Sequence, residues 1–200
     1  MTTTITAKDV QTLRQRTGAG MMECKKALEE TKGNIEQAVE HLRKKGIASA
    51  EKRAGKQTSE GIIGSYVHHN GKIAVLVEVG CETDFVARTD DFKELARAIA
   101  EHIAAAAPLG LDKDTVPSDV VERERRIFEE QVRESGKPEN LIAKIVDGKV
   151  ESYYKDVALL HQAWVREPKK TIGDLVKETS AKLGENVVVR RFVRYQLGEA

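Results

Sequence analysis

The amino-acid sequence predicts an α+β protein with a helical start and a small antiparallel sheet covered by helices. Three observations predict this class. Apolar residues recur at helical spacing near the start of the chain. Two β-rich segments then flank an Asn-Gly pair. A charged stretch with two helical periods lies between that hairpin and a last β-rich segment, so we expect an inserted antiparallel helical hairpin.

The first predicted domain is a three-helix module over residues 1–46. Its apolar residues fall into three groups, each about as long as a small helix. The helical period fades over residues 47–60, which carry few large apolar side chains, so we interpret them as a linker. The expected caps and breaks are Thr6 with Asp9, residues 18–20, and Gly33 with Asn34.

The second predicted domain is an α+β core over residues 61–200 that begins with a β-hairpin. Residues 62–67 and 73–79 are the two strands, and Asn70 with Gly71 suits a tight turn that needs positive φ. Strand side chains alternate between faces, so the second strand has a strongly apolar face. That face carries Ile73, Val75, Val77 and Val79, and the other carries Ala74, Leu76 and Glu78.

Two covering helices and a third strand complete the predicted core. Apolar residues at steps of three and four predict a helix over residues 92–103, which ends by Pro108. A second helix is expected over residues 171–183, with Thr171 and Asp174 as its cap. The third strand is expected over residues 187–195. One of its sides carries Val187, Val189, Val193 and Tyr195, although Arg191 interrupts it.

Residues 118–157 form a charged insertion within the predicted core. Two helical stretches, residues 118–134 and 138–155, are joined by a turn at Gly136. Their apolar residues form a narrow seam that suits a coiled-coil arm better than a globular core.

Composition and targeting signals exclude several classes of protein. The 33 Lys and Arg residues nearly balance the 32 Asp and Glu residues, so no global field steers the chain toward nucleic acid or a membrane. The basic residues of positions 44–56 have no interleaved aromatic residues, so we interpret them as a solvated linker and assign no nucleic-acid site. Since residues 1–6 lack a signal sequence and no apolar run is long enough to span a membrane, we expect a cytoplasmic protein.

The sequence predicts neither a cofactor nor a catalytic centre. Cys24 and Cys81 lie far apart and are expected to be reduced thiols. His68 and His69 have no carboxylate or cysteine partners at metal-ligand spacing, so no metal site is expected. No glycine-rich stretch ends as a phosphate-binding loop does, and no feature tunes a carboxylate as a general acid. We expect a binding protein and not an enzyme.

Two segments carry a resemblance to a known family. They read RTGAGMMECKKAL at residues 16–28 and CETDFVA at residues 81–87. Both resemble signature segments of the bacterial elongation factor Ts family. The similarity continues through SGKP at residues 135–138, KIVDGK at residues 144–149 and the final strand, so it covers nearly the whole chain in the family's order.

The resemblance implies a fold that agrees with the elements predicted above. It implies that residues 1–46 form a ubiquitin-associated-like (UBA-like) module, and that the helical hairpin of residues 118–157 serves dimerisation. Compared with longer family members, the chain has one hairpin-plus-helix unit where they have two, and it lacks their C-terminal helical module, so it resembles a short form. We therefore expect a homodimer.

The resemblance also implies a function in translation elongation. Family members bind elongation factor Tu with GDP, dislocate its bound magnesium ion and promote release of GDP, so that GTP can bind. The segment implied to enter the nucleotide-binding domain of Tu comprises Thr83, Asp84, Phe85 and Val86. Met21 and Met22 are implied to touch the same domain.

Each implied contact has a structural alternative. From residue types alone, Asp84 would cap a turn and Phe85 would fill the core, because apolar residues usually pack inside. Met21 and Met22 would also be core residues, since methionine fills irregular gaps. Two other functions remain open: an adaptor that uses only the N-terminal module, and a purely structural coiled-coil dimeriser.

Overall fold

The computed structural model describes residues 5–199, and these form two compact units. The first unit contains the chain up to Gly61 together with Gly80–Phe92 and Val176–Val188. The second unit contains Ile62–Val79, Lys93–Leu175 and the chain from Val189 onward. The two units are not the predicted domains, whose boundaries stay predictions.

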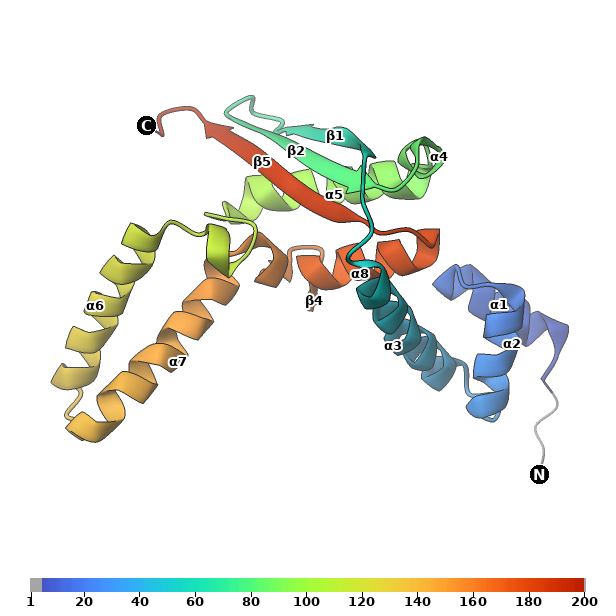
Figure 1. Cartoon of the computed structure of the whole chain (residues 1–200), viewed down its shortest axis with the longest axis horizontal. Coiled ribbons are helices and arrows are strands. Elements are labelled where there is room, and N and C mark those ends of the chain that lie inside the picture. The colour runs from blue at the N-terminus through green and yellow to red at the C-terminus, as the bar shows by residue number, and fades with distance from the viewer. Residues whose placement is uncertain (1–4, 200) are drawn as a thin grey trace. The chain divides into compact units, whose positions relative to one another are not determined.

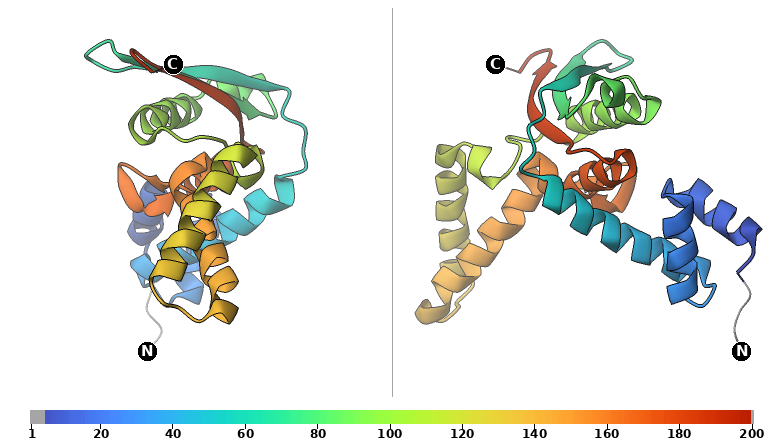
Figure 2. Two further views of the ribbon diagram at one scale, coloured as in Figure 1. Left: turned by 90° about the vertical axis from the view of Figure 1, so that its left-hand side faces the viewer. Right: turned by 45° about the vertical axis from the view of Figure 1, so that its right-hand side comes forward.

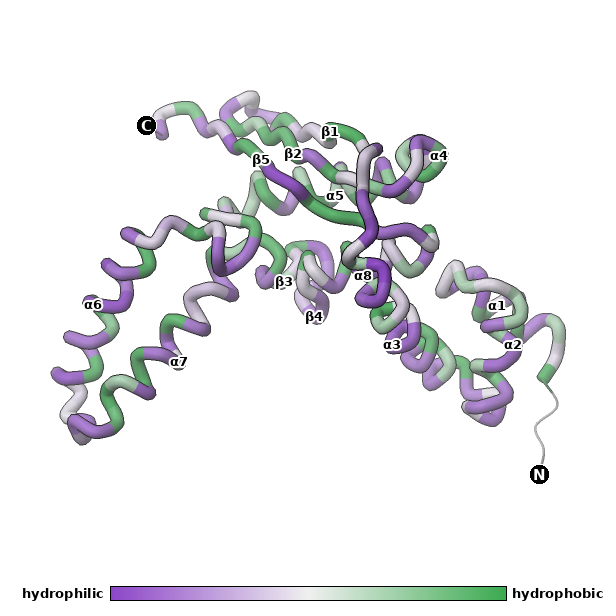
Figure 3. Tube along the Cα trace, in the orientation of Figure 1, coloured by the Kyte–Doolittle hydropathy of each residue, from purple (hydrophilic) through white to green (hydrophobic). Residues whose placement is uncertain are grey.

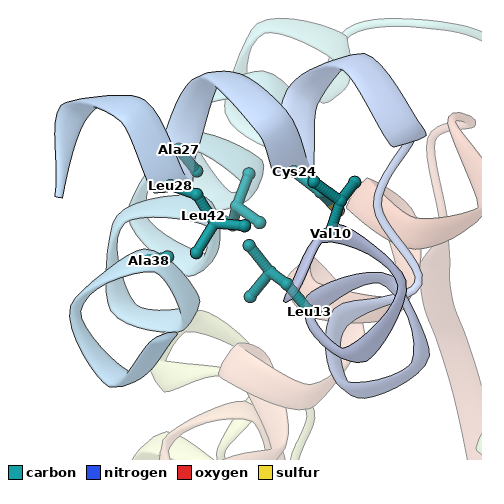
Figure 4. Packing of buried hydrophobic residues seen from close by; sticks show 7 residues of the cluster. All are labelled: Val10, Leu13, Cys24, Ala27, Leu28, Ala38 and Leu42. Atoms are coloured by element: carbon teal, nitrogen blue, oxygen red, sulfur yellow. The ribbon is translucent and has the colours of Figure 1, made fainter. Parts of the chain in front are cut away.

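Three packed helices begin the first unit: α1 (Ala7–Thr17), α2 (Met21–Glu30) and α3 (Ile35–Arg53). The expected cap of α1 is confirmed, because the Thr6 backbone N–H donates to the Asp9 carboxylate (2.9 Å) and the Asp9 N–H donates to the Thr6 hydroxyl (3.2 Å). Asn34 caps α3 as expected. The buried cluster between the helices consists of Val10, Leu13, Cys24, Ala27, Leu28, Ala38 and Leu42 (Figure 4).

Helix α3 is longer than predicted, because residues 47–53 continue it where a linker was expected. Two contacts explain the continuation. Ala50 is buried, and Gly46 lies so close to Ala181 that a Cβ on it would be 3.0 Å from the Ala181 Cβ. Tertiary packing therefore maintains a helix whose local apolar period has faded. The irregular segment before the sheet is shortened to the few residues after Ala54.

The three-stranded sheet has the order β1-β2-β5, with β1 (Glu60–Val67), β2 (Ile73–Cys81) and β5 (Val188–Gln196). Gly71 has φ +67° in the hairpin turn between β1 and β2, as its place after Asn70 predicted. Helix α5 (Asp90–Ala106) covers one face of the sheet (Figure 1). At Gly64 of β1 any Cβ would lie 2.9 Å from Ala96 of α5, so glycine permits this close approach.

The two faces of the sheet differ in burial. Val75, Val77 and Val79 of β2 are buried, which confirms the predicted apolar face. The prediction for the last strand was incomplete, because Val193 and Tyr195 of β5 are exposed. Arg191 lies on the same side and forms an ion pair with Glu78 (2.7 Å), which places a charged pair among exposed apolar residues. The exposed apolar residues of the sheet are Ile63, Val67, Leu76, Val193 and Tyr195.

The predicted helical insertion consists of α6 (Ser118–Glu134) and α7 (Glu139–Val157), which lie side by side in all views (Figures 1 and 2). Gly136 has φ +69° in the turn between them. Hydrophilic residues alternate with apolar ones along both helices (Figure 3). Apolar residues of both helices meet in a seam, and the coiled-coil arm stays a prediction. The buried residues of the seam are Val132, Val146 and Val150, with Val121, Phe128, Ile142, Ile145 and Tyr154 packed against them.

A second hairpin precedes α8 (Ile172–Leu183), and the sequence analysis missed it. The short strands β3 (Ala163–Trp164) and β4 (Glu167–Thr171) pair antiparallel. The prediction of one hairpin-plus-helix unit is therefore wrong. The hairpin has no β-rich alternation, and its strands include charged residues and Pro168, so no periodic signal marked it. The remaining short elements are the 3₁₀ turns η1 (Lys113–Thr115) and η2 (Leu159–His161).

Candidate partner-binding site

A helix of one turn, α4 (Asp84–Ala87), follows strand β2 in the CETDFVA segment. Thr83 is its N-cap: the backbone there is extended, and the hydroxyl accepts the Val86 N–H (3.4 Å). The Cys81 thiol donates to the Thr83 carbonyl (3.2 Å), which ties the start of the turn to the end of the strand. Local hydrogen bonds thus fix the backbone on which Phe85 is carried.

Phe85 is the most exposed aromatic side chain of this region, with 77% of its surface accessible. The alternative in which Phe85 fills the core is therefore wrong. Asp84 forms an ion pair with Arg88 (2.8 Å), in which the Arg88 side chain is exposed and the Asp84 side chain is about half exposed. Val86 is half-buried beside the buried Ala87. The segment thus presents one apolar ring and one carboxylate to the solvent.

Glu185, from the loop between α8 and β5, holds the base of this segment. One of its carboxylate oxygens accepts the backbone N–H groups of Glu82 and Thr83, each at 3.0 Å. The other accepts the Thr83 hydroxyl proton at 2.6 Å. Hydrogen bonds to an ionised acceptor are stronger than neutral ones. Since the same hydroxyl accepts the Val86 N–H, Thr83 connects Glu185 with the first turn of α4.

A second carboxylate, that of Glu82, binds in turn to the backbone next to Glu185. Glu82 accepts the backbone N–H of Asn186 (2.6 Å) and pairs with the Lys56 ammonium (3.0 Å). These two contacts, in that order, hold the pKa of the Glu82 carboxyl below its ordinary value. The Asn186 side-chain amide donates to the Lys56 carbonyl (2.8 Å), and Arg53 donates to the Gly184 carbonyl. We call Glu82 and Glu185, with the N–H groups that they accept, the carboxylate clamp.

The two methionines of the other predicted contact lie at the start of α2. Met21 is 47% exposed and Met22 is 66% exposed, so the alternative that places them in the core is wrong for both. Met21 borders a shallow hollow on α1 and Met22 does not. The hollow is lined by Ala7, Gln11, Arg14, Gln15, Gly18 and Met21.

The comparisons with known proteins decide the family. The family described as Elongation factor TS matches residues 1–199. The elongation factor Ts of Fervidobacterium nodosum is 56% identical over 98% of this chain and 99% of its own length. The elongation factors Ts of Desulfosudis oleivorans and Geobacter metallireducens are each 55% identical over 98% of this chain, and over 99% and 90% of their own lengths. This chain belongs to the elongation factor Ts family.

Members of the elongation factor Ts family are translation elongation factors. Between residues 5 and 199, no group of His, Cys, Asp and Glu side chains could hold a metal ion. No described helix is long and apolar enough to cross a membrane. Cys24 and Cys81 are buried free thiols, and burial raises the pKa of the Cys81 thiol.

The family resemblance implied the exposed residues of this elongation factor Ts segment, whereas the residues that hold it were not predicted. Glu185 and Asn186 lie about a hundred positions from Thr83, and no local spacing connects them. Lys56 and Arg53 were interpreted as solvated, whereas both reach into the hydrogen-bond network around the clamp. The only sign of these residues in the sequence was that Glu185 and Asn186 stand directly before the predicted last strand.

Proposed function

We propose that this protein is a guanine-nucleotide exchange factor, which binds elongation factor Tu with GDP and promotes release of GDP so that GTP can bind. Membership of the elongation factor Ts family supports the partner. The observation that carries the proposal is the exposed Phe85 on a hydrogen-bonded turn. Since translation takes place in the cytoplasm, we propose that location.

Phe85 acts in this proposal as a rigid apolar wedge. An aromatic ring has few rotatable bonds, so its insertion into a pocket of the partner loses little side-chain entropy. Because the ring is already exposed, no core of this protein has to open before it binds. Thr83 takes part as the N-cap of α4, and Val86 as a partly buried residue within it.

Asp84 supplies the negative charge beside that wedge. The magnesium ion in the partner neutralises phosphate charge, so its displacement weakens the hold on GDP. A carboxylate brought near the ion competes for the waters and donors around it. In the free protein Asp84 is paired with Arg88 in an exposed ion pair, a contact weak enough to exchange for partners on Tu. No bond in GDP is made or broken, so the protein is not an enzyme.

Thermodynamic linkage sets a quantitative condition on this function. If binding of the factor weakens the affinity of Tu for GDP, then GDP weakens the affinity of Tu for the factor by the same ratio. The complex with nucleotide-free Tu is therefore the tightest, and GTP reverses it. Titration calorimetry of the factor into nucleotide-free and GDP-loaded Tu would measure one ratio, and titration of GDP into Tu with and without the factor should give the same value.

We propose that the start of α2 forms a second contact with the nucleotide-binding domain of Tu. Met21 and Met22 are both exposed, and Met21 borders a hollow on α1. Methionine is a flexible and polarisable contact residue. The Met22→Ala variant should weaken complex formation while the maximal rate of GDP release stays near that of the unchanged protein.

The decisive experiment follows the release of a fluorescent GDP analogue from purified Tu. The unchanged protein should accelerate release, and the Asp84→Ala/Phe85→Ala variant should not. Val165→Ala is the matched control, because it removes another exposed apolar side chain, on the second hairpin. Failure of the unchanged protein to accelerate release would reject exchange activity. The alternative would then be a UBA-type adaptor, whose binding would depend on Met22 and not on Phe85.

We also propose a homodimer. The hairpin of α6 and α7 exposes Ile127 and Leu141, and its own seam is narrow. Light scattering at micromolar concentration should give the dimer mass, and Ile127→Glu/Leu141→Glu should give the monomer mass. Leu76→Glu, on the exposed face of the sheet, is the contrasting variant. If Leu76→Glu gives the monomer mass and Ile127→Glu/Leu141→Glu does not, the dimer surface is the sheet and not the hairpin.

A further inference from the structure

We infer that Glu185 is a positioning residue, which holds the Thr83–Val86 turn in its binding conformation before any partner arrives. The inference rests on the proposed function for its effect on exchange, and on the hydrogen bonds of the free protein for the positioning itself. The function proposed above uses the side chains that face the partner. The clamp holds the backbone that carries those side chains.

The geometry of Glu185 suits this role. Its carboxylate accepts three hydrogen bonds from two consecutive residues, namely from the N–H groups of Glu82 and Thr83 and from the Thr83 hydroxyl. These are the last positions before α4 begins. A carboxylate with two oxygens and several lone-pair sites is the side chain that can accept all three at once. The backbone directly before Asp84 and Phe85 is thereby tied to the loop of residues 184–187.

The α4 turn has little else to hold it. It comprises four residues, which is too short for a stable helix on its own. Phe85 is exposed and contributes almost nothing to the core, and Ala87 is the only one of the four residues that is fully buried. Polar contacts at the N-cap therefore carry much of the order of this turn.

The carboxylate clamp is itself held by contacts of Glu82 and Asn186 with Lys56. Glu82 accepts the Asn186 N–H, so each of the two segments supplies a carboxylate to the backbone of the other. Lys56 reaches Glu82 with its ammonium and accepts the Asn186 amide with its carbonyl, which ties both segments to the residues after α3. Rotation of Glu185 away from Thr83 would leave two half-buried N–H groups without an acceptor. A single arrangement is thus strongly favoured.

Loss of the clamp has a specific kinetic consequence. If the turn samples other conformations, only the competent fraction can bind, and the apparent dissociation constant rises by the inverse of that fraction. Once Tu is bound, its pocket orders the turn, so the maximal rate of GDP release is kept. Loss of positioning should therefore raise the half-saturating concentration of the factor, whereas loss of Phe85 should lower the maximal rate of GDP release.

The test uses the full chain with Glu185→Ala and Glu185→Gln. For the alanine variant we expect a half-saturating concentration roughly 10-fold higher with the maximal GDP-release rate unchanged. The glutamine variant should show a smaller rise, because its single amide oxygen can still accept both N–H groups. Glu51→Ala is the matched control, since it removes a carboxylate of the same unit that pairs only with Lys177 among the described contacts.

Hydrogen–deuterium exchange of residues 82–86 in the free protein separates this inference from the proposed function. Faster exchange in Glu185→Ala than in Glu51→Ala, with cooperative melting kept in both, supports positioning even if no GDP release is seen. Unchanged protection of this segment would overturn it. A rise in amide exchange together with an unchanged half-saturating concentration would overturn its role in partner binding. If the alanine variant does not fold, the same comparison is made with Glu185→Gln.

Discussion

Two consecutive helices, α4 and α5, use the same residue type in opposite ways. Phe85 in α4 is 77% exposed, and Phe92 in the first turn of α5 is fully buried at 0%. The large apolar residues of α5, namely Phe92, Leu95, Ile99 and Ile103, recur at helical spacing and are all buried. Helix α4 has no such face and is held by a capping threonine and the carboxylate clamp.

The difference shows how this fold separates stability from recognition. Where apolar burial holds a helix, its large side chains are part of the core and are not available to a partner. Where hydrogen bonds at the N-cap hold the turn, a large apolar side chain is free to face outward. Substitutions in α5 should therefore act on folding, and substitutions in α4 should act on binding.

The largest expected effect is the contrast between Phe92→Ala and Phe85→Ala. Removal of the buried ring should lower the free energy of unfolding by about 3 to 5 kcal/mol, because transfer and cavity terms add. Removal of the exposed ring should change it by less than about 0.5 kcal/mol while impairing GDP release. Urea denaturation of both variants measures the difference. Similar losses of stability in the two variants would break the comparison.

A smaller effect concerns the one buried histidine of α5. His102 accepts the Val165 N–H at Nδ1 (3.3 Å), so its Nε2 carries the proton and donates to the Gln162 side-chain oxygen (3.0 Å). Gln162 in turn donates to the Asp156 carbonyl (2.7 Å). Burial lowers the pKa of His102 below its ordinary value of 6.5. Thus α5, which is held by apolar packing, also contains one buried polar side chain, and both ring nitrogens of this histidine are hydrogen-bonded.

The sign of the resulting pH dependence follows from that pKa. As the pH falls below about 6.5, the unfolded chain takes up the proton first, so the folded state loses stability until the lower folded-state pKa is reached. The slope is at most about 1.4 kcal/mol per pH unit for one proton. In His102→Gln this contribution should disappear, whereas His161→Gln, at an exposed position, should keep it. Equal slopes in the two variants, measured by denaturation between pH 5 and 7, would contradict the assignment.

The sequence predicted the elements held by periodic burial and missed those held by distant polar contacts. The spacing of Phe92, Leu95, Ile99 and Ile103 was sufficient to place α5, because the signal repeats every turn. The exposed residues of α4 came from a family resemblance and not from a physical signal. Glu185 was missed because its hydrogen bonds join segments that only the tertiary fold brings together. Residues 47–53 were taken for a linker for the same reason: their helix depends on packing against α8.

The smallest expected effect compares exposed ion pairs on the two helices. Asp84 of α4 pairs with Arg88, the C-cap of that helix, and Arg97 pairs with Glu101 within α5, both at a spacing of four residues. Such a pair contributes about 0.3 to 0.5 kcal/mol and is screened by salt. In Arg97→Gln, Glu101 keeps its contact with Arg166, so the loss should be close to zero.

In Arg88→Gln, no second cation contacts Asp84 among the described residues, so the loss of about 0.3 to 0.5 kcal/mol should appear in full. It should appear as faster amide exchange within the single turn of α4 and not as a lower melting temperature, because the turn adds little to global stability. High salt should abolish the difference between this variant and the unchanged protein. If Arg88→Gln instead lowers the melting temperature as much as a core substitution, α4 is integrated into the core, and the distinction between the two helices fails.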